Sequence, residues 1–200
     1  MSYYELLPHP TFDEVDYGTW EEGFTSDECD KIIQLGESLT AIDSTVQSSK
    51  GHNTGAYNDG IRKSKNSWIK CTNDTEWLYD RIGKISRTLN GMHWRFDITG
   101  FNEDLQYTRY NDDSSYYGWH IDGQVKSDNP PRKLSMTIQL SDPSEYEGGD
   151  FQINGSQLHT LPKQKGLSIL FPSYTLHQVT PVTKGIRRSL VVWLCGPAFR

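Results

Sequence analysis

Apolar residues recur at helical spacing in two segments of the first half of the chain. The first segment is Ser26–Leu39, where Thr25 and Glu28 stand three positions apart as in a capping box, which marks the start of a helix. The second is Thr75–Leu89, followed by Asn90-Gly91, a pair typical of a helix end. The apolar positions are Ile32, Ile33 and Leu35 in the first segment, and Trp77, Leu78, Ile82, Ile85 and Leu89 in the second. The pattern predicts two amphipathic helices.

From Trp94 onward the pattern changes to short apolar runs separated by turn residues, which is typical of strands. The runs expected to form strands are Trp94–Ile98, Asp104–Tyr110, Tyr117–Ile121, Lys133–Leu140, Asp150–Ile153, Gly166–Phe171, His177–Pro181 and Ser189–Cys195. Many short strands with Gly, Pro and Asn turns favour a closed or double-sheet β core. We therefore expect a mainly β protein with flanking helices (α+β), namely a double-stranded β-helix or jelly roll with N-terminal helices packed outside.

The length of 200 residues suits a single domain over residues 1–200, with residues 1–93 as helical support and residues 94–200 as the jelly-roll core. The segment Val46–Gly60 is rich in Ser, Gly and Asn. We expect it to be a mobile loop, which in an enzyme could act as a lid.

The formal net charge of -6 disfavours a nucleic-acid partner, because a surface that follows phosphates normally carries a basic excess. The three cysteines, Cys29, Cys71 and Cys195, form no CxxC pair, so neither a disulfide framework nor a cysteine zinc site is indicated. Residues 1–10 lack a signal-peptide pattern, and the longest apolar stretch, Leu190–Cys195, is too short to span a membrane. We expect a soluble cytoplasmic protein without a membrane partner.

The segment around His120-Ile121-Asp122 carries the first candidate chemistry. Residues two apart on a strand face the same side, so His120 and Asp122 can reach one point. An imidazole and a carboxylate are two parts of the 2-His-1-carboxylate triad of Fe(II) oxygenases. An HxD tripeptide alone is weak support, since an exposed histidine at a strand end and an aspartate in a turn give the same letters.

A third ligand has two downstream candidates, His159 and His177. Ten residues after His177 stands Arg187, whereas the same offset from His159 gives Ile169. An arginine binds a carboxylate with two parallel hydrogen bonds, and 2-oxoglutarate has a second carboxylate that needs such a partner. We therefore prefer His177, and interpret His159 as a surface turn residue. Alternation along the strand lets Arg187 point inward while Arg188 points outward.

Three stretches in this order resemble the prolyl 4-hydroxylase branch of the 2-oxoglutarate/Fe(II) dioxygenases, including related bacterial and phage hydroxylases. They are the HxD motif, EGGDF at Glu147–Phe151, and LFPSYTLHQVTPVTKGIRRSLVVW, which ends at Trp193. Upstream, Arg62-Lys63-Ser64 with Trp68 is similar to an R-x-S…W element on the family's substrate side. The resemblance is strongest over Asp104–Trp193.

The resemblance implies Fe(II) bound by His120, Asp122 and His177, with 2-oxoglutarate and O2 as cosubstrates and ascorbate as a supporting reductant. It implies decarboxylation to succinate and CO2 coupled to C–H hydroxylation, in a proline-containing peptide or protein. The residues with further implied roles are Arg187, Tyr110, Gln139 and Trp193 at the cosubstrate, and Arg62, Tyr117 and Trp119 at the substrate. Gln139 departs from several relatives, which place a tyrosine there, and Trp193 has an equally good role in core packing.

Two other functions stay open at this point. One is hydroxylation of a free amino acid or another small molecule by the same chemistry. The other, of a different class, is a non-catalytic jelly-roll binding module, which would not need the metal ligands together with Arg187. Demethylation of nucleic acid is disfavoured by the acidic charge and by the placement of Arg187. The sequence leaves the oligomeric state undetermined.

Overall fold

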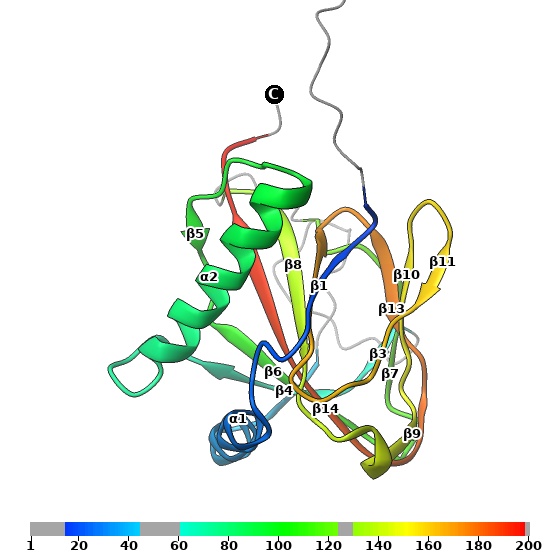
Figure 1. The fold of residues 1–200 in the computed structure, drawn as a ribbon. Helices are drawn as coiled ribbons and strands as arrows, with labels where there is room; N and C mark the ends of the chain where they lie inside the picture. The colour runs from blue at the N-terminus through cyan, green and yellow to red at the C-terminus, as the bar shows by residue number, and fades with distance from the viewer. Residues whose placement is uncertain (1–14, 45–60, 124–129, 199–200) are drawn as a thin grey trace, which may run out of the picture.

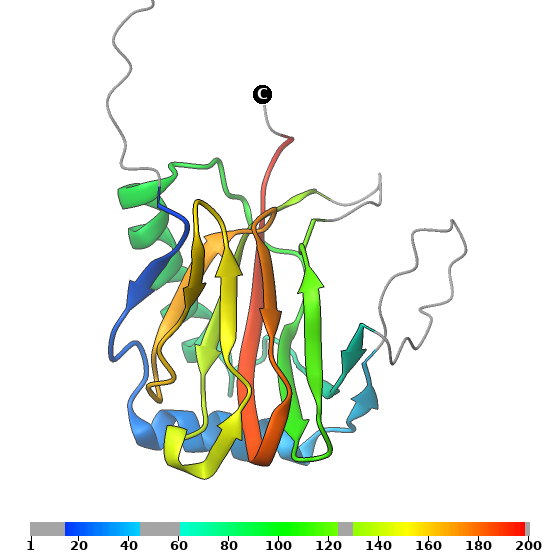
Figure 2. The same ribbon diagram turned by 90° about the vertical axis from the view of Figure 1, so that its right-hand side faces the viewer.

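Two antiparallel β-sheets face each other in the computed structural model, which describes residues 15–44, 61–123 and 130–198 (Figures 1 and 2). The expected mobile loop Val46–Gly60 lies outside the described residues, so its role as a lid stays a prediction. The mainly β architecture with flanking helices is confirmed. No helix among the described residues is both long and apolar enough to cross a membrane.

The larger sheet has nine strands in the described part of the chain. They are β1 (Gly18–Trp20), β2 (Ile42–Asp43), β4 (Lys65–Ile69), β5 (Gly100–Phe101), β6 (Leu105–Asn111), β8 (Arg132–Gln139), β9 (Tyr146–Gly148), β12 (Ser168–Pro172) and β14 (Val182–Cys195). Their order is β1-β12-β8-β14-β6-β4-β2, with β5 and β9 both paired to β14. Strand β14 is therefore the central strand of this sheet, and it is much longer than the predicted strand Ser189–Cys195.

Five strands of the described ranges form the smaller sheet. They are β3 (Arg62–Lys63), β7 (Tyr116–His120), β10 (Phe151–Asn154), β11 (Leu158–Thr160) and β13 (Leu176–Val179), and their order is β11-β10-β13-β7-β3. A 3-10 turn, η1 (Pro143–Glu145), precedes β9. Strands β1 to β4 all lie before residue 94, so the N-terminal part of the chain contributes strands to both sheets besides the expected helices.

The two helices pack on the outer side of the larger sheet, away from the smaller one (Figure 1). Helix α1 (Ser26–Ser38) begins with the predicted capping box, in which the Glu28 amide donates to Thr25 Oγ1 and the Thr25 amide donates to Glu28 Oε2. Helix α2 (Glu76–His93) covers the same sheet. Alternate residues of the central strands complete this core: Leu134, Met136, Ile138, Leu190, Val192 and Leu194.

The predicted end of the second helix at Asn90-Gly91 is wrong, because α2 continues to His93. The amides of Trp94 and Arg95 both donate to the Asn90 carbonyl, which closes the last turn. The Asn90 side chain then donates to the Phe96 carbonyl and accepts from the Phe96 amide. Asn90 thus caps the segment after the helix while its own backbone stays helical.

The predicted strand Trp94–Ile98 is also wrong, since these residues form a turn and an irregular segment in the structure. Arg95 has a φ of 52°, in the left-handed region, which turns the chain away from an extended path. Trp94, Phe96 and Ile98 are partly buried against the helix-side core. Apolar and polar residues alternate here because one side of an irregular segment faces the core. The periodicity of the sequence alone cannot distinguish such a segment from a paired strand.

The space between the sheets is divided into an apolar and a polar part. The apolar part is the second hydrophobic cluster, consisting of Tyr110, Tyr146, Phe151, Ile153, Leu161, Leu167, Ile169, Phe171, Val179 and Val182. The polar part is made by inward-facing residues of the larger sheet that are all buried, namely Asn66, Gln106, Thr108, Ser135, Thr137, Gln139, Arg187 and Ser189. Buried polar groups at this density are costly unless they bind one another or a ligand.

Candidate metal centre

Two adjacent strands of the smaller sheet position the predicted triad. His120 at the end of β7 and His177 near the start of β13 are direct partners in the antiparallel register. Side chains of such a pair stand on the same face, which here is the face toward the larger sheet. Asp122 follows two residues after His120, and its amide donates to the Ser173 carbonyl at 2.9 Å. This bond fixes the chain beyond the end of β7, so that the carboxylate lies beside both imidazoles.

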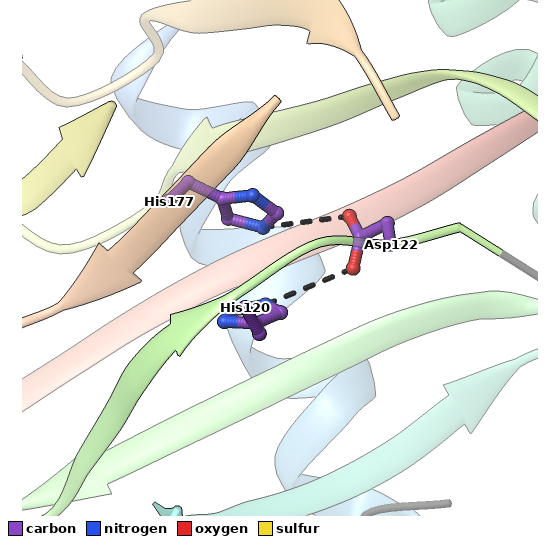
Figure 3. Close-up of side chains that lie close together, drawn as sticks. All are labelled: His120, Asp122 and His177. Atoms are coloured by element: carbon purple, nitrogen blue, oxygen red, sulfur yellow. Dashed lines mark ion pairs between the residues drawn. The ribbon is translucent and has the colours of Figure 1, made fainter. Parts of the chain in front are cut away.

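The three side chains converge on one point (Figure 3). His177 Nε2 lies 3.5 Å from Asp122 Oδ2, and His120 Nε2 lies 3.7 Å from Asp122 Oδ1. One ligand atom from each residue lies within 4.8 Å of the other two. The exposed fraction is 7% for Asp122 and 5% for His177, so these two ligands are buried, and the His120 side chain is 12% exposed.

Both imidazoles are held in the tautomer that a metal requires. His120 Nδ1 lies 2.7 Å from the Gly118 carbonyl, and His177 Nδ1 lies 2.8 Å from the Thr175 carbonyl. A carbonyl only accepts, so each Nδ1 carries the proton and donates. The lone pair of each ring is therefore on Nε2, directed at Asp122. Hydrogen bonds of this kind from the far ring nitrogen are the usual support of metal-binding histidines.

The charge states also suit metal binding. Burial, followed by the neighbouring His177 ring, lowers the pKa of His120 to about 3, so this imidazole is neutral at physiological pH. Burial acts to raise the pKa of Asp122, but the two imidazoles, Arg132 and the Ser135 hydroxyl together hold it below its ordinary value. Asp122 is therefore ionised. Two ring nitrogens and one carboxylate on one side of a point fit Fe(II) with its remaining positions open.

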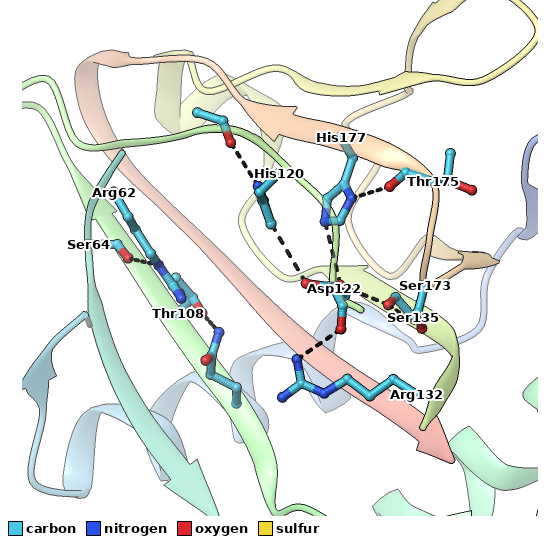
Figure 4. A network of polar contacts seen from close by, with 12 residues as sticks. Arg62, Ser64, Thr108, His120, Asp122, Arg132, Ser135, Ser173, Thr175 and His177 are labelled. Carbon is cyan, nitrogen blue, oxygen red and sulfur yellow. Dashed lines mark hydrogen bonds and ion pairs between the residues drawn. The ribbon is translucent and has the colours of Figure 1, made fainter. Parts of the chain in front are cut away.

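A polar network that the sequence did not single out supports Asp122 (Figure 4). Ser135 Oγ donates to Asp122 Oδ2 at 2.7 Å and lies 2.9 Å from Ser173 Oγ. Arg132 Nη1 lies 3.4 Å from the Asp122 carbonyl oxygen, and its guanidinium binds Glu103 through two hydrogen bonds. A signal was present in the sequence: the run LSMTIQL places Ser, Thr and Gln at every second position of β8, so one face of this buried strand is polar.

Arg187 lies in the polar part between the sheets, with an exposed fraction of 1%. Its Nη2 donates to Gln139 Oε1 at 2.9 Å and its Nη1 to Ser189 Oγ at 3.3 Å, while its buried Nε has no partner in the described part of the chain. Among the described residues no carboxylate forms an ion pair with it. A buried guanidinium with only neutral partners and an unused donor fits an anionic ligand.

The other residues implied at the cosubstrate are near Arg187 or near the triad. The Arg187 guanidinium carbon lies 5.3 Å from the centre of the Tyr110 ring, and Gln139 accepts from Arg187. Trp193 lies on the same strand, with Arg132 stacked 3.7 Å from its ring centre. The Trp193 Nε1 is buried and without a partner in the described residues.

The residues implied on the substrate side divide into two groups. The Tyr117 ring stacks on the His120 ring, with ring centroids 3.4 Å apart. The Arg62 guanidinium carbon lies 4.4 Å from the centre of the Tyr117 ring. Arg62 is buried and donates to Ser64 Oγ. Trp119, in contrast, is 42% exposed. The structure does not bring Trp119 to the triad, because alternation along β7 points it to the face opposite that of His120.

The interpretation of His159 as a surface turn residue is wrong. His159 lies on β11, opposite Ile153 of β10, and its Nε2 is 2.8 Å from Asp16 Oδ2. The same carboxylate accepts from the amide and the hydroxyl of Ser156. His159 therefore attaches the N-terminal segment to the edge of the smaller sheet, away from the triad.

Comparisons with known proteins agree with this geometry. A sequence model of the 2OG-Fe(II) oxygenase superfamily matches residues 105–195, which run from the start of β6 to the end of β14. A PKHD-type hydroxylase of Nitrosomonas europaea is 35% identical over 99 residues, covering 44% of this chain and 41% of that protein. The PKHD-type hydroxylase YbiX of Escherichia coli K12 is 38% identical over 94 residues, with 44% and 41% covered. The chain thus spans about two fifths of the length of these relatives.

Solved structures extend the likeness to nearly the whole chain. A viral collagen prolyl hydroxylase from Paramecium bursaria Chlorella virus-1, in a 2OG complex, has a TM-score of 0.67 at 23% identity, covering 94% of this chain and 99% of that one. A prolyl-4-hydroxylase of Pseudomonas putida has a TM-score of 0.65 at 16% identity, with 92% and 94% covered. At such low sequence identity, the structural likeness shows the fold alone. The family uses Fe(II), 2-oxoglutarate and O2, and the His-Asp-His triad fits the metal. Residues 105–195 of this chain thus match the 2OG-Fe(II) oxygenase superfamily, and the chain has the fold of prolyl hydroxylases.

Proposed function

We propose that this protein is an Fe(II)- and 2-oxoglutarate-dependent hydroxylase of peptidyl proline, which couples decarboxylation of 2-oxoglutarate to succinate and CO2 with hydroxylation of a C–H bond. The observation that carries the proposal is the convergence of His120, Asp122 and His177, in which each imidazole donates from Nδ1 to a backbone carbonyl and turns its Nε2 to the Asp122 carboxylate. When bound, Fe(II) supplies the activation of O2 that no side chain can perform.

Arg187 is the proposed partner of the 2-oxoglutarate carboxylate that is remote from the metal. Its burial and its unused Nε leave it able to form a charge-assisted hydrogen bond that no described acidic residue forms. The neighbouring Tyr110 ring and Gln139 hold the guanidinium in place. Burial of Asp122, His177 and Arg187 keeps water from these groups, which strengthens the charge interactions there.

A peptide substrate is supported by the fold and by the relatives. One solved structure of similar fold is a prolyl hydroxylase of Trichoplax adhaerens in complex with a peptide fragment, with a TM-score of 0.68 at 18% identity, covering 90% of this chain and 84% of that one. In this chain the stack of Arg62 on Tyr117 and of Tyr117 on His120 is the proposed substrate side of the metal. Tyr117 orients the His120 ring and offers its edge to the substrate.

One observation favours a second candidate, hydroxylation of a free amino acid. Arg62 has an exposed fraction of 5%, and among the described residues its hydrogen bonds go to the neutral side chains of Ser64 and Asn66. A buried cation is normally paired with an anion. The carboxylate of a free amino acid would provide that anion, whereas a peptide would offer only a carbonyl oxygen.

The test is a turnover assay with Fe(II), ascorbate and 2-oxoglutarate, with Pro-rich peptides or free proline as substrate. We expect succinate release and one added oxygen on peptidyl proline by mass spectrometry, and oxygen on free proline alone would favour the second candidate. His177→Ala should lose iron and turnover, because two ligands rarely retain this metal. His159→Ala is the matched control and should keep both.

Three results would contradict parts of this proposal. A wild-type protein that binds no Fe(II) and releases no succinate with any of these substrates would refute it. Iron binding without turnover would favour a non-catalytic binding module. Loss of iron in His159→Ala but not in His177→Ala would show that the triad is misassigned.

A further inference from the structure

The two oxygens of the Asp122 carboxylate have different surroundings. Oδ2 accepts a hydrogen bond of 2.7 Å from Ser135 Oγ. Oδ1 has no hydrogen-bond donor among the described residues, and it faces His120 Nε2 at 3.7 Å. The exposed fraction of Ser135 is 0%, so water does not compete for this bond. One oxygen is thus held by the protein and the other is available.

The direction of the hydrogen bonds follows from the charge of the carboxylate. An ionised carboxylate only accepts, so the single hydroxyl proton of Ser135 goes to Asp122. Ser135 Oγ also lies 2.9 Å from Ser173 Oγ, and with its own proton used it must accept there. Ser173 therefore donates to Ser135, and Ser135 donates to Asp122 (Figure 4). Ser173 is buried as well, with an exposed fraction of 1%.

The backbone holds this chain of hydrogen bonds in register. Ser135 lies on β8, where it is the antiparallel partner of Phe171 on β12 and of Trp193 on β14. Ser173 follows β12 directly, and its carbonyl accepts from the Asp122 amide. The two serines therefore join the larger sheet, which carries Arg187, to Asp122, two residues beyond the end of β7.

We infer that Ser135, supported by Ser173, is the positioning residue that sets the rotation of the Asp122 carboxylate, so that Oδ1 is presented to the metal. The inference rests on the proposed function, because it assigns a role toward the Fe(II) of that same site. Without the Ser135 hydroxyl the carboxylate can rotate, and metal binding must then fix it. Partners of this kind typically contribute 10- to 100-fold in metal affinity or activity.

The experiment measures the dissociation constant of Co(II) alone by visible absorption, without turnover. Ser135→Ala should raise that constant by roughly 10- to 100-fold. Ser135→Thr retains a hydroxyl and should restore most of the affinity. Ser173→Ala leaves the bond from Ser135 to Asp122 in place, so it should have a smaller effect than Ser135→Ala.

The matched control is Ser67→Ala. Ser67 is also a fully buried serine with one hydrogen bond, from its Oγ to the Gly36 carbonyl of α1, but it lies on the helix side of the larger sheet. The Ser67→Ala variant should lose about as much unfolding free energy as Ser135→Ala, while its Co(II) dissociation constant stays at the wild-type value. Thermal unfolding of each variant confirms that affinity is measured on folded protein.

The outcomes separate this inference from the proposed function. If wild type binds Co(II) and folded Ser135→Ala binds it equally well, the positioning role is refuted and the metal site stands. If Ser135→Ala does not fold, Ser173→Ala decides. A loss of Co(II) affinity greater than that of Ser67→Ala supports the positioning role, and an unchanged Co(II) affinity overturns it. If wild type binds neither Co(II) nor Fe(II), both proposals fail.

Discussion

Replacement of Arg187 by methionine tests the proposed binding of 2-oxoglutarate most directly. Methionine matches the arginine side chain as far as the position of Nε and carries no charge, so it removes the guanidinium while its own side chain fills most of the space of the arginine stem. The substitution leaves Gln139 Oε1 without its 2.9 Å donor, which costs about 1–3 kcal/mol of stability. Circular dichroism is needed to confirm that the variant is folded at the assay temperature.

The expected loss of affinity follows from the burial of Arg187. Its exposed fraction is 1%, and its Nε is unused among the described residues, so the ligand carboxylate would bind a fully desolvated cation. Removing one partner of a buried, hydrogen-bonded charge pair costs about 2–5 kcal/mol. With a factor of ten per 1.4 kcal/mol, the dissociation constant of 2-oxoglutarate should rise by about 30-fold to several thousand-fold.

The neighbouring arginine provides a matched control. Arg188 points to the opposite face of β14, where its Nε binds Glu37 Oε1 at 3.1 Å near the protein surface. Arg188→Met removes the same group one residue away, and the affinity for 2-oxoglutarate should remain at the wild-type value. The assay is titration of 2-oxoglutarate into Co(II)-loaded protein, followed by the KM for 2-oxoglutarate in succinate release.

If Arg187→Met and Arg188→Met changed the dissociation constant of 2-oxoglutarate equally, its affinity would depend on the overall charge or stability of the protein and not on the buried site. An unchanged dissociation constant in folded Arg187→Met would refute the reasoning outright. Arg187→Lys distinguishes charge from shape, since lysine keeps the charge and loses the planar fork. We expect it to recover only part of the affinity.

Two further predictions concern the stability of the metal-free protein. The pKa of His120 is about 3 when folded and 6.5 when unfolded, so between these values the unfolded state binds more protons. The unfolding free energy should therefore decrease as the pH is lowered from 6.5, by up to about 1.4 kcal/mol per pH unit. Urea unfolding at pH 7 and pH 5 measures this, and an equal slope in His120→Asn would contradict it. A Cβ at Gly36 would overlap the Tyr107 ring, so Gly36→Ala should lower the unfolding free energy by about 1–3 kcal/mol. A Cβ at Gly91 would have no described atom within 4 Å, so Gly91→Ala should raise the unfolding free energy by up to about 1 kcal/mol through α2. The opposite order of melting temperatures would refute the packing argument.

The metal ligands could be predicted because each depends on local order. Residues two apart in an extended segment face the same side, so His120 and Asp122 could be paired from their spacing, although Asp122 lies two residues beyond the end of β7. The selection of His177 depended on Arg187 ten residues later, and the structure brings His177 beside the other two. The capping box of Thr25 was equally local, since both of its hydrogen bonds join residues three apart.

The failures share a different physical origin. Strand β14 extends back to Val182 because β9 and β6 pair with its first half, and the sequence there, with Lys184 and Gly185, lacks an apolar pattern. His159 became a structural residue because Asp16, distant in the sequence, lies beside it. Pairing partners that are far apart in sequence are not encoded in the periodicity of either segment.

The sequence by itself determined the helices, seven of the fourteen described strands and the identity of the metal ligands, because strand alternation and helix capping act between residues close in the chain. Only the tertiary structure decided what surrounds those ligands. The bond from Ser135 to Asp122 joins β8 to the end of β7, and the burial of Arg187 requires both sheets to close over it. Such contacts form only when two sheets pack, since the partners of a buried polar group are set by the fold and not by its neighbours in sequence.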